Sequence, residues 1–149
     1  MNYDFYGWET ADTKPIAFLY PSITDPRGLY AALLECWCAE TCAPRLRDKW
    51  SPENPTKGQC SITAFLAQDI FGGKVYGIPL GDGNVHCYNV VGDCLFDLTS
   101  AQFGERAKLL VYENNPEQTR ETHFAKEEKR LRYEMLKKLL SEREKLITR

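Results

Sequence analysis

The chain has 149 residues, of which 43% are hydrophobic, and a formal net charge of −2. That length suits one domain, and the apolar fraction excludes a disordered chain. The weak net charge argues against a nucleic-acid or membrane-surface partner, and no apolar run is long enough to span a membrane. Because the N-terminus lacks the basic and apolar regions of a signal peptide, we expect a cytoplasmic location and mostly free thiols among the six cysteines.

Residues 1–27 are rich in aromatic side chains and are interrupted by Pro15, Pro21 and Pro26. Within them, 16–20 could form a short edge strand. So many aromatic side chains are poorly tolerated in water, so we expect an arm that covers an apolar surface of the core or of a neighbouring subunit.

The next expected element is a helix over 29–42, which Pro44 would end. Cys36, Cys38 and Cys42 fall in it and raise the question of a metal site. In a helix Cys36 would point away from the other two, and no histidine lies nearby in sequence. Small packing thiols are therefore favoured over a zinc site, and we expect neither a metal nor an organic cofactor.

A polar, proline-containing connector over 45–57 leads to an apolar helix over 61–71, which Gly72 and Gly73 would stop. Cys60 stands at the head of this helix, where unpaired N–H groups and the helix dipole favour an anion. With a histidine nearby, a thiol there can have its pKa lowered from about 8.5 to between roughly 3.5 and 7.5. The alternative is a small buried residue at a helix start.

A strand over 74–80 should precede a tight hairpin, with strands over 85–91 and 94–98 joined by Gly92 and Asp93. In that register Asn89 faces Phe96, and His86 lies diagonally across from Asp97 on one sheet face. The spacing therefore predicts an imidazole–carboxylate pair, on the face that we expect to meet the Cys60 helix. The alternative is an exposed histidine and aspartate on a solvated face.

After the hairpin, 108–112 is a possible fourth strand, and 117–148 reads as one long amphipathic helix with interleaved acids and bases. This helix could lie across the core or pair with a second copy, so a homo-oligomer through it or through the N-terminal arm is possible. We interpret His123, within it, as an ordinary surface histidine. The chain thus divides into an arm (1–27), an α+β core (28–112) and a charged helical segment (113–149).

The order Gly58-Gln59-Cys60, apolar helix, His86 and then Asp97-Leu98-Thr99 resembles the core of the papain-like and transglutaminase-like cysteine superfamily. With Trp50, Asn54-Pro55, Phe71-Gly72-Gly73, Asn89 and Gln102-Phe103, the pattern over about 28–104 is similar to the YunG-like family of small bacterial proteins of unestablished function. The resemblance implies an α+β fold, with helices on a small antiparallel sheet. It also implies Cys60 as nucleophile, His86 as base and Asp97 as orienting carboxylate. Gln59 and the Cys60 amide would be the oxyanion donors, although the oxyanion glutamine of papain-like peptidases lies several residues before the cysteine.

These residues predict a cysteine-dependent hydrolase or acyltransferase that acts on a peptide, isopeptide or small amide. Two alternatives stay open. The same fold could serve as a binding module without catalysis, or Cys60 could be a redox-sensing thiol that other cysteines resolve.

Overall fold

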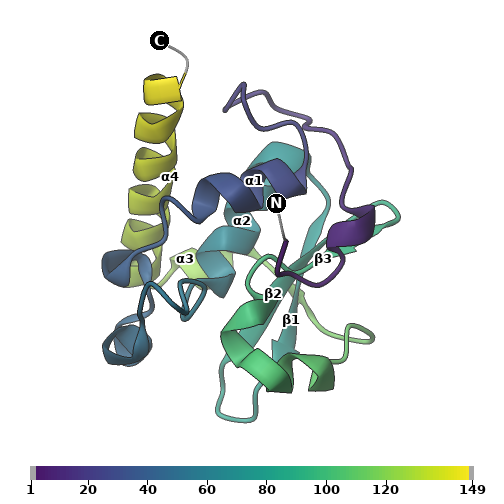
Figure 1. Ribbon diagram of the computed structural model, residues 1–149. Helices are drawn as coiled ribbons and strands as arrows, with labels where there is room; N and C mark the ends of the chain where they lie inside the picture. The colour runs from purple at the N-terminus through teal and green to yellow at the C-terminus, as the bar shows by residue number, and fades with distance from the viewer. Residues whose placement is uncertain (1–2, 148–149) are drawn as a thin grey trace.

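The computed structural model describes residues 3–147 as an α+β fold in which helices pack on a small antiparallel sheet (Figure 1). The helices are α1 (Pro26–Leu33), α2 (Cys60–Phe71), α3 (Arg120–Phe124) and α4 (Glu127–Ile147). The strands are β1 (Lys74–Pro79), β2 (Val85–Val91), β3 (Cys94–Phe96) and β4 (Glu117–Gln118), in the order β3-β2-β1-β4. Short 3₁₀ segments cover Trp8–Thr10, Ala39–Thr41, Pro44–Lys49 and Ser100–Leu109. Within residues 3–147, no helix is both long and apolar enough to cross a membrane.

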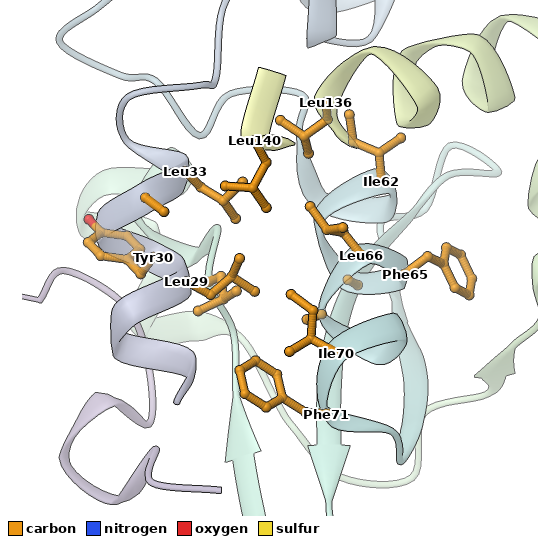
Figure 2. Close-up of a cluster of buried hydrophobic side chains, with 14 of the residues drawn as sticks. Leu29, Tyr30, Leu33, Ile62, Phe65, Leu66, Ile70, Phe71, Leu136 and Leu140 are labelled. Carbon is orange, nitrogen blue, oxygen red and sulfur yellow. The ribbon is translucent and has the colours of Figure 1, made fainter. Parts of the chain in front are cut away.

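The core fills the space between α1, α2 and α4 (Figure 2). Leu29 and Leu33 of α1 approach it from one side, and Leu136 and Leu140 of α4 from another, all with no exposed surface. Burying a leucine side chain contributes about 1.5–3 kcal/mol, so α4 is an integral part of the fold. Of the two arrangements open for the C-terminal helix, the chain adopts the one that lies across the core.

The helix α2 packs against one face of the sheet, mainly on β2. The Asn89 side chain donates a 2.8 Å hydrogen bond to the Ala64 carbonyl, and Cys87 on the same face is buried in the core. The prediction that the His86 and Tyr88 face meets this helix is therefore wrong. Since side chains alternate along a strand, that face lies opposite, where Phe103 and Tyr112 cover it.

The helix expected over 29–42 ends at Leu33 instead. The hydroxyl of Thr41 accepts a hydrogen bond from the Cys38 backbone at 3.1 Å and starts a separate 3₁₀ turn. The Trp37 indole meanwhile donates to the buried Thr63 hydroxyl of α2 at 2.9 Å. The Thr41 cap and the contact of Trp37 with Thr63 thus end the helix earlier than the apolar spacing predicts.

Two expected strands are absent from the described residues. The Ile16 and Ala17 amides donate to the Ile70 carbonyl at 2.7 and 3.2 Å. The segment 16–20 therefore supplies hydrogen-bond donors to a carbonyl in the last turn of α2 and does not pair with a sheet edge. The segment 108–112 is mostly 3₁₀ helix and loop, and β4 takes the place beside β1. The arm does cover the core, since Phe5 is buried and packs 5.0 Å from the Tyr30 ring.

The segment expected as one helix over 117–148 is divided into β4, α3 and α4. Glu117 and Gln118 pair with β1, and the Thr119 side chain then caps α3. The ring of Phe124 packs 5.3 Å from Phe65, which holds the bend before α4 against α2. This bend carries residues of α3 and α4 to the end of α2 where Cys60 lies.

Candidate active site

Cys60 is the first residue of α2, and its place depends on the turn before it. Gly58 adopts a left-handed conformation with φ 72°, and its carbonyl accepts a 2.9 Å hydrogen bond from the Ala43 amide. An added Cβ at Gly58 would lie 2.5 Å from the Cys42 sulfur, so only glycine fits. The half-buried Cys60 sulfur lies 3.8 Å from the Val85 carbonyl oxygen at the start of β2.

His86 and Asp97 form the predicted pair. The imidazole Nε2 lies 2.6 Å from Oδ2 of Asp97, and both side chains are buried. The same Oδ2 accepts a hydrogen bond from the Tyr112 hydroxyl at 2.7 Å, and Oδ1 accepts one from the Thr99 amide at 3.3 Å. Because Nε2 is engaged by Asp97, Nδ1 is the ring nitrogen available to Cys60.

The electrostatics of the Cys60 thiol are set mainly by two neighbours, Cys87 and His86. The interaction with the Cys87 side chain lowers the pKa of Cys60 well below 9.0, and the polar and charged interaction with His86 lowers it further against the opposing effect of burial. Burial also works to lower the pKa of His86, but Asp97 and Cys60 raise it to about 10. A lowered thiol pKa beside a raised imidazole pKa favours a thiolate next to an imidazolium.

Cys60 and His86 open onto a pocket of about 570 Å³. Its other walls come from the 3₁₀ segment at Pro44, the loop before β2, Gln102 and Phe103, and the α3–α4 bend. That volume is in the range of small-ligand sites. The pocket therefore has room for a small ligand beside Cys60.

The structure does not bring the Gln59 side chain to this pocket. Gln59 is fully buried, and its amide nitrogen donates to the Cys38 carbonyl at 3.1 Å, while its Oε1 has no hydrogen-bond partner among the described residues. Gln102 lines the pocket instead, with Nε2 3.5 Å from His86 Nδ1 and 3.1 Å from the Thr99 carbonyl. Its Oε1 accepts a 3.3 Å hydrogen bond from the Gly58 amide, which ties it to the Cys60 turn.

Sequence reasoning missed several residues of the site. Cys87 adjoins Cys60, Tyr112 donates a hydrogen bond to Asp97, and Lys129 lines the pocket. His123 is not a surface histidine, because only 7% of it is exposed and it lies in the pocket wall. The strand alternation around His86 could have pointed to Cys87 as the residue toward α2, but the others come from segments whose structure was predicted differently.

The three cysteines considered for a metal site lie apart from this pocket. Cys36 packs in the core, Cys42 is buried against Gly58, and the Cys38 thiol contacts the Thr41 hydroxyl at 3.8 Å. Over residues 3–147, no group of three or more histidine, cysteine, aspartate or glutamate side chains is arranged to hold a metal ion.

Comparisons with known proteins support the YunG-like part of the resemblance, and none of them supports the papain-like and transglutaminase-like part. The model of the YunG protein family matches residues 25–145, which include Cys60, His86 and Asp97. The chain belongs to the YunG family. It is also similar to the "Uncharacterized protein YunG" of Bacillus subtilis (strain 168), with 42% identity over 55 residues, or 37% of this chain and 47% of that protein. The chain thus matches about half the length of this YunG relative, and no solved structure shows a significant match.

Proposed function

We propose that this protein is a cysteine-dependent hydrolase or acyltransferase that cleaves an amide bond, with an active site of the papain-like and transglutaminase-like kind. The observation that carries the proposal is the partly buried Cys60 at a helix start, in one pocket with His86, whose Nε2 lies 2.6 Å from Asp97. A structural cysteine in a core has no need of a partnered imidazole and a pocket.

In the proposed reaction, the Cys60 thiolate attacks the carbonyl carbon of a bound amide. The Cys60 backbone N–H at the helix start would stabilise the oxyanion, with the Gln102 amide as a second candidate donor. The His86 imidazolium donates its proton to the leaving amine, and the carbon–nitrogen bond breaks to leave a thioester on Cys60. Water or an amine, deprotonated by His86, then attacks the thioester and releases the thiol.

Selective alkylation tests this proposal directly. Iodoacetamide at pH 6, followed by mass spectrometry of peptides, should label Cys60 far faster than the other five cysteines, which serve as internal controls. An electrophilic amide-directed probe should react at the same residue. The selectivity should disappear in His86→Ala and also in His86→Gln, whose side chain is closer in size to histidine and leaves a smaller cavity. Circular dichroism checks that each variant is folded. Uniform slow labelling of all cysteines in the wild-type protein would refute the proposal and favour a binding module on the same fold.

Cys87 supports a second candidate function, a redox-sensing thiol. Its interaction with Cys60, together with burial, raises the pKa of Cys87 well above 9.0, so the Cys87 thiol remains protonated beside a Cys60 thiolate. Hydrogen peroxide would oxidise the Cys60 thiolate to a sulfenic acid and release water. Attack by the Cys87 sulfur would then form a disulfide with loss of a second water. Mild peroxide followed by peptide mapping should find a Cys60–Cys87 disulfide that dithiothreitol reverses; oxidation of Cys60 alone would contradict this candidate.

A further inference from the structure

The pocket wall supplied by α3 and α4 contains a lysine that is held in place by a hydrogen-bonded chain. Nζ of Lys129 lies 2.9 Å from Nδ1 of His123, and Nε2 of His123 lies 2.7 Å from Oε1 of Gln118. The Gln118 amide nitrogen donates to the Pro116 carbonyl at 3.1 Å, which fixes Oε1 as the atom that faces His123. His123 therefore donates from Nε2 and accepts from the Lys129 ammonium at Nδ1.

This arrangement gives the Lys129 amine a neutral hydrogen-bond partner in His123. Burial lowers the pKa of Lys129 below its ordinary 10.5, while the charges of Cys60 and Cys87 act in the opposite direction. Burial and the charge of Lys129 lower the pKa of His123 to about 4, so the imidazole is neutral and can accept the proton that the ammonium donates. A lysine ammonium has three N–H donors, and the imidazole takes one. Two donors remain for a ligand in the pocket that Lys129 shares with Cys60.

The charges around the pocket favour an anion. Arg45, Lys57 and Lys126 also line it, and within residues 3–147 none of them, nor Lys129, has a carboxylate within ion-pair distance. The acidic side chain in the lining is Glu128, and it is held by Arg132 at 2.8 Å. Since the whole chain carries a net charge of −2, this concentration of unpaired cations is local to the pocket.

We propose that Lys129 binds a carboxylate of the substrate, so that the amide attacked by Cys60 belongs to a molecule with an acidic group close to the scissile bond. This inference rests on the proposed function and names its substrate class. A single point charge with two free donors matches the charge of one carboxylate. Arg132, one turn further along α4 than Lys129, is engaged by Glu128 and by the Thr41 carbonyl, so it does not add a free bidentate group beside Lys129. Lys129 is then a specificity residue and His123 a positioning residue.

Two alkylating agents that differ in charge test the inference without a known substrate. Iodoacetate carries a carboxylate where iodoacetamide carries a neutral amide, and both alkylate the Cys60 sulfur with loss of iodide. We expect the ratio of their rate constants at Cys60 to exceed the ratio for N-acetylcysteine by roughly tenfold, as for a modest charge–charge interaction. Because both reagents react with the same thiolate, the ratio of their rate constants does not depend on the fraction of Cys60 that is deprotonated.

In Lys129→Met and Lys129→Gln the ratio should fall by most of that factor. His123→Leu should lower it in part, because the ammonium is present but no longer held. Lys138→Met is the matched control, since Lys138 is an exposed lysine of the same helix α4 outside the pocket lining, and it should leave the ratio unchanged. For the wild-type protein, raising the salt concentration should slow iodoacetate more than iodoacetamide.

The outcomes separate this inference from the proposed function. If Cys60 does not react selectively with iodoacetamide, the proposed nucleophile itself is refuted. If Cys60 reacts selectively but the ratio equals that of N-acetylcysteine and is insensitive to Lys129 and to salt, the carboxylate site is refuted while the nucleophile stands. The salt measurement needs no variant, so a Lys129 substitution that fails to fold leaves the inference testable.

Discussion

The imidazole of His86 and the carboxylate of Asp97 lie 2.6 Å apart, although eleven positions and a tight turn separate them in the chain. Asp97 has no exposed surface, and it accepts further hydrogen bonds from Tyr112 and Thr99. A buried carboxylate with three donors is held in one orientation, which in turn fixes the orientation of the imidazole.

Replacing Asp97 by asparagine should therefore lower the reactivity of the Cys60 thiol without abolishing it. Loss of the carboxylate charge would lower the pKa of His86 and raise that of Cys60. An opposite charge at this range shifts the pKa of its partner by about 1–3, so the imidazolium should be lost at a lower pH and alkylation of Cys60 near neutral pH should slow by up to roughly 1000-fold. The rate of iodoacetamide reaction, measured from pH 4 to 10, gives the thiol pKa directly. Asp82→Asn, in the exposed loop before β2, should leave that profile unchanged.

The pairing of a Cys60 thiolate with a His86 imidazolium predicts how the stability of the protein depends on pH. The pKa of His86 is about 10 in the folded protein against 6.5 in the unfolded chain, so its contribution is complete below pH 6.5 and is lost as pH rises toward 10. The pKa of Cys60 is lowered well below 9.0, so its contribution is complete above pH 9 and is lost as pH falls through the lowered value. Between about pH 6.5 and 9 the two slopes cancel, because folding only moves a proton from sulfur to nitrogen.

Urea unfolding of the wild-type protein and of His86→Gln, compared across pH 4 to 10.5, checks this expectation. The difference in free energy of unfolding should form a plateau between about pH 6.5 and 9 and decrease on both sides. A difference that rises steadily with pH across that range would show that no ion pair forms.

Gly58→Ala should destabilise the protein at the turn that presents Cys60. The new Cβ would meet the Cys42 sulfur at 2.5 Å and the Ala43 nitrogen at 2.9 Å, at a φ of 72° that favours glycine. Backbone strain and overpacking together should cost about 2–4 kcal/mol in urea unfolding. Gly81→Ala is the matched control, with φ 86° but no atom within 4 Å, and should cost only about 1–2 kcal/mol. Equal losses would mean that close packing at Gly58 is unimportant.

Arg120→Met should loosen the attachment of α3 to α2. The guanidinium lies 2.5 Å from the Asp69 carboxylate and donates to the Phe65 carbonyl at 2.8 Å, and a third of it is exposed. Removing it leaves a partly buried carboxylate and should cost about 2–3 kcal/mol of unfolding free energy, less than for a fully buried pair. Arg130→Met removes an exposed pair with Glu127 at 3.9 Å and should change stability by about 0.5 kcal/mol or less. Comparable losses in the two variants would contradict a structural role for Arg120.

The hairpin illustrates how far local rules extend. The pairings Val91 with Cys94 and Asn89 with Phe96 are confirmed, because a two-residue turn at Gly92 and Asp93 sets the register. Beyond Phe96 the expected pairing with β2 stops. The Asp97 amide donates instead to the Tyr6 carbonyl at 3.0 Å, so a segment from the other end of the chain takes over the edge. Asp97 reaches His86 all the same.

The sequence by itself determined the α+β class, the Cys60 helix, the hairpin and the His86–Asp97 pair. All of these follow from periodicity, glycine stops and turn geometry within a few residues of one another. Only the tertiary structure decided which sheet face α2 covers, that Gln59 points away from the pocket, and that Cys87, Gln102 and Lys129 surround Cys60. Those contacts join segments tens of residues apart, and burial of apolar surface between helices, which has no direction along the chain, selects them.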